Sequence, residues 1–285
     1  MSCKILADST CDLSPELVSR YDITILPLHV LLGEAEHKDG VDVTPAELLA
    51  WSDEHHTTPK TSAPSIDDAK HTLAELLGDD PTKEVVCFSI SSEMSSSGNV
   101  MAMAAHQLHA DERVFVVDSR NLSTGIGHLI IEAAIMASEG KTGAEIEAEM
   151  NRLTGKVRTS FIVDTLLYLH RGGRCSGLAA LAGAALKLHP VIVVEDGKMH
   201  ATKKYRGTIN MTVPKYVKDM EEALLAAKPD RVFITHSPID ASLVEEVRAY
   251  LESLHHFDEI LETTAGSVIS SHCGPGTLGV LFMEA

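Results

Sequence analysis

The chain has 285 residues and carries 41 acidic residues against 24 basic ones, a formal net charge of −17. This acidic balance argues against nucleic acid as a partner, because phosphate neutralisation requires a basic face. Hydrophobic residues make up 44% and aromatic residues only 4% of the sequence, so aliphatic side chains must fill the cores of a protein long enough for two domains.

The first part of the sequence alternates apolar runs with amphipathic segments. The apolar runs predict strands at residues 3–7, 24–32, 85–88 and 114–117. The amphipathic segments predict helices at residues 15–21, 46–54, 66–77, 99–109, 124–139 and 143–153, with N-caps at Ser14, Thr44, Ser65 and Ser123. Strands that alternate with helices are typical of a mostly parallel sheet between two helical layers. We therefore predict a three-layer α/β/α domain over residues 1–155.

The pattern changes near Gly155, where we place the domain boundary. Residues 156–285 are expected to form a second α/β domain with a mixed sheet. Its strands are predicted at residues 160–163, 191–194, 199–203, 232–235, 260–263 and 280–283, with a tight Asp196-Gly197 turn after the second. Helices are predicted at 165–170, 178–188 and 243–254, and one long helix is expected to end at residue 228. The two glycines and the proline after His272 predict an open loop there.

Residues 89–97 contain six serines between a predicted buried strand and a predicted helix. In an α/β sheet such a turn opens at the carboxyl end of a strand, where ligands bind. Hydroxyls and the free N–H groups of a helix N-terminus can hold a small anion there without a lysine. Serine and glycine also cap helices and form turns, so this stretch taken alone is more typical of a structural turn.

Charged residues gather in two further places. The first predicted strand ends in Asp8-Ser9-Thr10-Cys11-Asp12, which resembles phosphotransfer sites with a nucleophilic aspartate but lacks a second aspartate two residues later, so we do not predict that chemistry. Residues 156–206 hold nine basic residues against three acidic ones, which indicates either a dock for an acidic partner or a solvated face.

The cysteines and histidines predict neither a metal centre nor a cofactor. The five cysteines form no CxxC pair, which fits reduced thiols, and the histidines show no HxxxH or HExxH spacing. No apolar run reaches the ~18 residues of a transmembrane helix, and the N-terminal stretch is unlike a signal peptide. We therefore expect a cytoplasmic protein without a transmembrane segment.

Six short stretches occur in one order along the whole chain. They are residues 8–13 (Asp-Ser-Thr-Cys-Asp-Leu), 61–64 (Thr-Ser-Ala-Pro), 91–97 (Ser-Ser-Glu-Met-Ser-Ser-Ser), 118–119 (Asp-Ser), 171–176 (Arg-Gly-Gly-Arg-Cys-Ser) and 272–276 (His-Cys-Gly-Pro-Gly). Together they resemble the motifs of the DegV family, whose bacterial members bind fatty acids. Four positions depart from the family pattern near the head group: Glu93 and Ser96 stand where small residues or glycine are usual, Ser97 where threonine is usual and Ala63 where glutamine is usual.

The resemblance implies a non-enzymatic carrier that buries a long-chain fatty acid in a tunnel between its two domains. The carboxylate would be held by Thr61, Ser95 and His272. Secondary contacts are expected from Ser62, Ser96, Ser97 and Gly125. Some members present the carboxylate to a separate fatty acid kinase, which makes an acyl phosphate, and by position Arg174 and Arg206 would dock that kinase. Plausible tail-lining residues are Ile90, Met94, Ile126, Leu166 and the helix over 178–188.

Two other functions are weighed against this one. A serine hydrolase of acyl esters would use Ser95 as nucleophile and His272 as base, but it requires an acid that orients the histidine, and no G-x-S-x-G elbow is present. A nucleotide-binding protein would require a glycine-rich phosphate loop, and neither G-x-G-x-x-G nor a P-loop pattern occurs.

Overall fold

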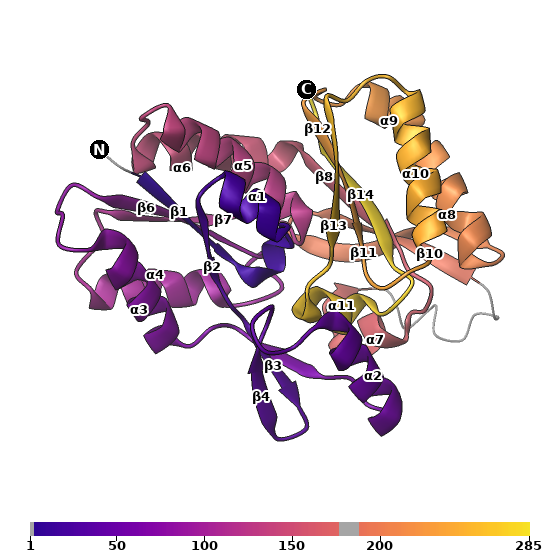
Figure 1. Cartoon of the computed structure of the whole chain (residues 1–285), viewed down its shortest axis with the longest axis horizontal. Coiled ribbons are helices and arrows are strands. Elements are labelled where there is room, and N and C mark those ends of the chain that lie inside the picture. Colours follow the sequence, from indigo (N-terminus) through magenta and orange to yellow (C-terminus); the bar gives the residue numbers. More distant parts are fainter. Residues whose placement is uncertain (1–2, 177–187) are drawn as a thin grey trace.

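The structure, a computed structural model, describes residues 3–176 and 188–285. These residues form a four-stranded, a seven-stranded and a three-stranded sheet, with helices packed around and between them (Figure 1). The mixed α/β architecture predicted from the sequence is confirmed, whereas the three-stranded sheet was not expected.

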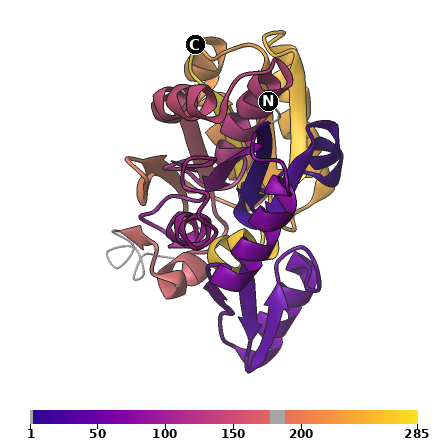
Figure 2. The ribbon, with the colours of Figure 1, turned by 90° about the vertical axis from the view of Figure 1, so that its left-hand side faces the viewer.

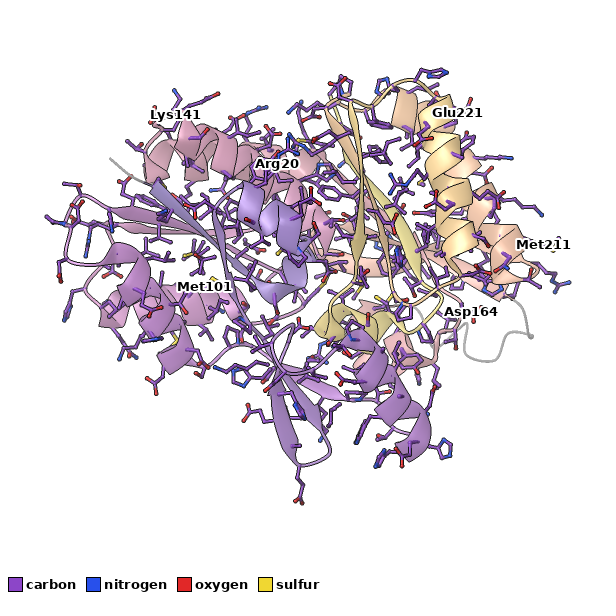
Figure 3. All side chains as sticks on the ribbon, viewed as in Figure 1. Arg20, Met101, Lys141, Asp164, Met211 and Glu221 are labelled. Carbon is purple, nitrogen blue, oxygen red and sulfur yellow. The ribbon has the colours of Figure 1, made fainter. Side chains whose placement is uncertain are left out.

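The four-stranded sheet is parallel throughout, in the order β2-β1-β6-β7. Its strands are β1 (Cys3–Asp8), β2 (Ile23–Leu26), β6 (Glu84–Ser89) and β7 (Val114–Asp118). Because side chains alternate along a strand, Leu6 of β1 faces α3 (Ile66–Leu77) and α4 (Ser97–Gln107), while Ile5 faces α5 (Thr124–Ser138) and α6 (Gly143–Leu153). Met101 of α4, labelled in Figure 3, is fully buried on the first of these faces.

The predicted strand over residues 24–32 is wrong as a single element. The chain leaves the parallel sheet at Pro27, which has no N–H to donate to a ladder. It then forms a separate antiparallel sheet in the order β4-β3-β5 from β3 (His29–Leu32), β4 (Ala35–Lys38) and β5 (Lys60–Ser62). With α2 (Pro45–His55), this sheet projects away from the rest of the molecule, as the purple strands at the bottom of Figure 2 show.

The seven-stranded sheet is mixed, in the order β13-β12-β14-β8-β10-β11-β9. Its strands are β8 (Val157–Ile162), β9 (Cys175–Ser176), β10 (Leu188–Glu195), β11 (Lys198–Arg206), β12 (Arg231–His236), β13 (Glu259–Thr264) and β14 (Leu278–Met283). The predicted Asp196-Gly197 hairpin joins β10 and β11. One face of the sheet packs against α8 (Ile209–Lys218), α9 (Glu221–Leu225) and α10 (Ala241–Ser253).

The helix α5 lies between the two large sheets and is buried nearly all round. Ile126 and Ile130 pack in the cluster that contains the parallel strands and β8, while Ile131 packs against Phe233 and Leu281 of the mixed sheet. Two short helices, α7 (Leu167–Gly172) and α11 (Ser267–Cys273), lie against each other near α2 (Figure 1). Tyr168 and Val268 of these helices share an apolar cluster with the three-stranded sheet.

Several other predicted elements need correction. The long helix ending at residue 228 is two helices, because the chain leaves α8 at Asp219, whose carboxylate accepts hydrogen bonds from Lys203 and Tyr205 of β11. The predicted helix over 178–188 lies outside the described residues except for Leu188, which begins β10. The boundary predicted near Gly155 falls between α6 and β8 and stays a prediction. In the part of the chain that the structure describes, no helix has the length and apolarity needed to cross a membrane.

Candidate functional site

A pocket of about 230 Å³ lies where the serine turn after β6, the strands β5 and β11 and the helix α11 meet. It is lined by Leu28, Thr61, Ser62, Ala63, Ile90, Met94, Ser95, Ser96, Leu122, Arg174, Met199, Val268, Ile269, His272 and Cys273. The pocket thus has several polar side chains from distant parts of the chain and walls that are otherwise mostly apolar.

The serine turn presents Ser95 to this pocket. After β6, whose residues from Val85 onward are buried, the turn closes through hydrogen bonds from the N–H groups of Met94 and Ser95 to the carbonyl of Ser91. The hydroxyl oxygen of Ser95 accepts the N–H of Ser97 at 3.3 Å, so its proton is free to be donated into the pocket. Helix α4 then begins at Ser97, two residues beyond Ser95.

Thr61 and His272 meet at another part of the pocket lining. Thr61 is held in β5 by pairing with Val30, and its Oγ1 lies 2.9 Å from Nε2 of His272. The expectation of an open loop around His272 is wrong, because the residue stands in the last turn of α11. The helix ends immediately afterwards at Gly274, whose φ of 79° is a conformation that glycine adopts without strain.

The imidazole of His272 is neutral at ordinary pH. Desolvation, followed by the positive charge of Arg174, lowers the pKa of His272 to about 4. Its Nδ1 is buried without a hydrogen-bond partner among the described residues and faces Gly172 so closely that a Cβ there would lie 2.3 Å away. Because an unpaired buried N–H is rarer than an unpaired acceptor, we assign the proton to Nε2. Nε2–H then donates to Thr61 Oγ1, and the threonine hydroxyl can donate to a ligand.

Arg174 lies at the pocket as well as on the surface. Its guanidinium donates to the carbonyl of Gly172 at 2.6 Å, and the side chain is exposed. Arg206, the second residue predicted for partner docking, is not brought near it. Arg174 precedes Cys175, which pairs with Met199 at the start of β11, and Arg206 is the last residue of that strand. Because these strands are parallel, Arg174 is level with Lys198, so at ~3.3 Å per residue eight residues separate the two arginines by roughly 26 Å along the strand.

The other predicted contacts divide into two groups. Ser62 and Ser96 line the pocket. Ser97 and Gly125 do not: Ser97 is fully buried at the start of α4, and Gly125 packs against Asn121 and Thr159.

The predicted apolar lining divides in the same way. Ile90 and Met94 line the pocket, whereas Ile126 and Leu166 belong to the main core cluster outside it.

Glu93, which departs from the family pattern, pairs with a lysine and does not line the pocket. Its carboxylate is exposed and lies 3.4 Å from Nζ of Lys198 on the neighbouring hairpin, outside the pocket lining. Glu93 therefore does not point its charge at a ligand in the pocket. The neighbouring Ser91 donates to the carbonyl of Gly197 at 2.7 Å, so the serine turn and the hairpin are joined at two points.

The pocket lacks the machinery of a serine hydrolase. Ser95 and His272 make no hydrogen bond with each other, and within the described ranges no carboxylate contacts Nδ1 of His272. The geometry therefore gives no support to the hydrolase hypothesis. A search of residues 3–176 and 188–285 also finds no group of three potential metal ligands.

Sequence reasoning missed part of the lining. Leu28, Met199 and Val268 were not expected at the pocket, although Pro27 beside Leu28 marked the break that turns the chain toward it. It also missed Asp12 and Asp39, whose carboxylates accept hydrogen bonds from the first N–H groups of α11. No local pattern indicates these contacts, because the partners are more than 200 residues apart.

Comparisons with known proteins agree over the full length. The model of an uncharacterised-protein family, DegV, matches residues 2–285. A DegV domain-containing protein of Clostridium perfringens is 30% identical over 287 residues, covering 99% of this chain and 98% of its own. A Thermus thermophilus structure, described as showing fatty acid binding of a DegV family protein, has 30% identity, full coverage of both chains and a TM-score of 0.90. A stearic acid-binding protein of Eubacterium ventriosum has 28% identity, a TM-score of 0.83 and coverage of 99% and 98%.

Proposed function

Since this chain belongs to the DegV family, we propose that it is a carrier that binds a long-chain fatty acid, with the carboxylate at Thr61, Ser95 and His272. The observation that carries the proposal is the convergence of these three side chains on one pocket whose remaining walls are mostly apolar, with the hydroxyls of Ser95 and Thr61 as donors and His272 donating to Thr61. The fatty acids described for the Thermus thermophilus and Eubacterium ventriosum relatives support the ligand class.

The head group would be held by neutral donors. A carboxylate in an apolar site is costly unless it is hydrogen-bonded, and each bond to a charged acceptor contributes roughly 1.5–3 kcal/mol. Ser95 donates from the serine turn and Thr61 from β5, with the imidazole of His272 behind the threonine hydroxyl. These contacts would fix the orientation of the carboxylate. Arg174 also lines the pocket, but its guanidinium donates to the carbonyl of Gly172, so we assign this residue to partner docking and not to the carboxylate.

The tail would supply most of the affinity. About fifteen buried methylenes at ~0.8 kcal/mol each give a gross contribution of roughly 12 kcal/mol, reduced by ordering the chain and by the loss of free translation. A second cavity of about 20 Å³ shares Leu122, Ile269 and Cys273 with the head-group pocket and extends toward Phe161 and Leu281. A tail that runs inward from the carboxylate between the two large sheets would have to widen this cavity.

The direct test is the ligand itself. We expect gently purified protein, once denatured and extracted, to release a long-chain fatty acid detectable by mass spectrometry. Thr61→Val and Ser95→Ala should each weaken binding of added palmitate. Ser92→Ala is the matched control, because this serine lies in the same turn but bonds Asp118 and stays outside the pocket. No extracted fatty acid together with no binding of palmitate would refute the proposal.

The protein would present its bound carboxylate to a separate kinase for acyl-phosphate formation. Arg174, which is at the pocket and exposed, supports this role. A dock that also includes Arg206 must extend roughly 26 Å along β11, which is within the span of an ordinary protein interface. A partner that uses ATP would require a cytoplasmic location for both proteins.

We expect Arg174→Glu with Arg206→Glu to abolish phosphorylation of the bound fatty acid by the host's fatty acid kinase. The double variant should retain its lipid, and Lys141→Glu, at an exposed position before α6, should leave phosphorylation unchanged. Loss of lipid from the double variant would contradict the separation of docking from binding.

A further inference from the structure

The aspartates of the turn after β1 are not used by the proposed function. Asp8 ends β1, η1 (Ser9–Cys11) follows, and Asp12 adopts a left-handed conformation with φ of 51°. Their side chains are buried, with 0% exposure for Asp8 and 6% for Asp12, so neither is an accessible nucleophile. A third aspartate, Asp39, is 2% exposed and lies beside Asp12, since both carboxylates border Gly266.

Asp12 and Asp39 both accept hydrogen bonds from backbone N–H groups at the N-terminus of α11. Oδ1 of Asp12 accepts the N–H of Gly266 at 2.8 Å, and Oδ1 of Asp39 accepts the N–H of Ser267 at 2.8 Å. The hydroxyl of Ser267 donates to the carbonyl of Val43, which lies four residues beyond Asp39. These are the first N–H groups of a helix that ends at Cys273, one residue after His272.

The second oxygen of each carboxylate accepts a hydrogen bond from a serine hydroxyl. Oδ2 of Asp12 accepts the hydroxyl of Ser123 at 2.5 Å, and Oδ2 of Asp39 accepts the hydroxyl of Ser9 at 2.7 Å. Ser123 was expected to cap α5 with its side chain, but it makes no such bond and contacts Asp12 instead. Each carboxylate therefore bridges a hydroxyl near the parallel sheet and the backbone of α11.

Asp8 makes the equivalent connection to the serine turn. Its Oδ2 accepts the N–H of Ile90 at 2.9 Å, and its Oδ1 accepts both the N–H and the hydroxyl of Thr10. Ile90 is the first residue after β6 and lies five residues before Ser95. The same short turn thus contacts both halves of the head-group pocket, through Asp8 on one side and through Asp12 on the other.

We propose that Asp8, Asp12 and Asp39 are positioning residues that set the serine turn and α11 relative to each other, so that Ser95, Thr61 and His272 converge. The proposal rests on the proposed function for its effect on ligand binding, whereas its effect on His272 can be observed without ligand. Desolvation raises the pKa of all three carboxyl groups, so burying them opposes folding, and positioning accounts for them better than stabilisation does.

The test compares three readouts in Asp12→Asn, Asp39→Asn and Asp8→Asn. Side-chain ¹⁵N resonances of histidine, with the His272 signal assigned by loss in His272→Gln, report the bond to Thr61 in ligand-free protein. Palmitate affinity reports the assembled pocket, and urea unfolding reports stability. Asp240→Asn is the control, because it removes a carboxylate from the N-terminus of α10 away from the pocket. Should an aspartate variant fail to fold, Ser123→Ala and Ser9→Ala loosen the same bridges more gently.

We expect Asp12→Asn and Asp39→Asn to shift the Nε2 signal of His272 and to weaken palmitate binding about tenfold or more, as loss of a bond to a charged acceptor does. Asp8→Asn should weaken binding but leave the His272 signal in place, and Asp240→Asn should change neither. An unchanged His272 signal in the folded Asp12, Asp39 and serine variants would overturn the proposal. Wild-type protein that binds no palmitate would refute the proposed function, while the His272 signal would still decide the positioning role.

Discussion

Replacing Gly172 with alanine should weaken ligand binding in the head-group pocket, although Gly172 does not line the pocket. The imidazole of His272 is held between Gly172 on the Nδ1 side and Thr61 on the Nε2 side. A Cβ at position 172 would lie 2.3 Å from Nδ1 and 3.2 Å from Cε1. Ordinary van der Waals contact requires about 3.5 Å, so the ring must move by about 1 Å. It cannot retreat directly, because Thr61 already lies 2.9 Å beyond Nε2, and it must therefore swing out of line.

The expected cost falls mainly on binding. Moving the imidazole releases the Thr61 hydroxyl from its position, and losing the hydrogen bond from Thr61 to the charged carboxylate corresponds to about 1.5–3 kcal/mol, or roughly a 10- to 150-fold weaker affinity for palmitate. The accompanying overpacking should lower the free energy of unfolding by about 1–3 kcal/mol. Titration calorimetry with palmitate and urea unfolding measure the two effects separately.

Two glycines provide the controls. Gly155→Ala meets nothing within 4 Å and should change neither quantity. Gly173→Ala has free space but a φ of 68°, so it should cost about 1 kcal/mol of stability without reaching His272. If Gly172→Ala binds palmitate within twofold of the wild-type protein, the reasoning from His272 is refuted.

Three further predictions concern stability. His128 is 1% exposed, and desolvation lowers its pKa to about 4, so its contribution to stability is present above the unfolded pKa near 6.5 and is lost as pH falls toward 4, by about 2 kcal/mol at pH 5. In urea unfolding, the stability of His128→Gln should therefore fall less steeply with decreasing pH than that of the wild-type protein, and an equally steep fall would count against this explanation. Glu132→Ala leaves the buried guanidinium of Arg231 with Asp230 as its remaining carboxylate partner and should lower the free energy of unfolding in urea by about 2–3 kcal/mol. The control Glu149→Ala breaks an exposed pair with Arg152 and should cost less than ~0.5 kcal/mol, and equal losses in the two variants would contradict the role of burial. Gly143→Ala places a Cβ 2.3 Å from the ring of Phe115 and should lower the melting temperature, with Phe115→Leu restoring part of the loss; no recovery would argue against the clash.

Local signals predicted the elements that depend on local chemistry. Thr44 and Glu47 form the capping box that starts α2, and the hydroxyls of Ser14 and Ser65 cap α1 (Pro15–Arg20) and α3 as expected. The individual strands of the parallel sheet followed from buried runs such as β6, whose pattern needs no knowledge of distant residues, and their alternation with helices predicted the parallel arrangement. These features are set within one turn of chain, which is why sequence reasoning reached them.

Features that depend on distant partners were not predicted. Helix α11 has no side-chain cap of its own and begins on the carboxylates of Asp12 and Asp39, so its sequence is typical of a loop. The three-stranded sheet depends on packing against Tyr168 and Val268, although Pro27 did mark its beginning. Thr61, Ser95 and His272 were named from a family resemblance, because nothing in their local sequence brings them together.

The enclosure of α5 has a consequence for how the molecule comes apart. Helix α5 packs between the two large sheets, and its neighbouring residues Ile130 and Ile131 belong to different apolar clusters. A fragment ending at α6 would leave Ile131 without Phe233 and Leu281, and would be prone to aggregation. Denaturation should therefore be a single cooperative transition. A ligand must enter through a local rearrangement at the edge of the pocket, because separating the two large sheets would expose α5 to water.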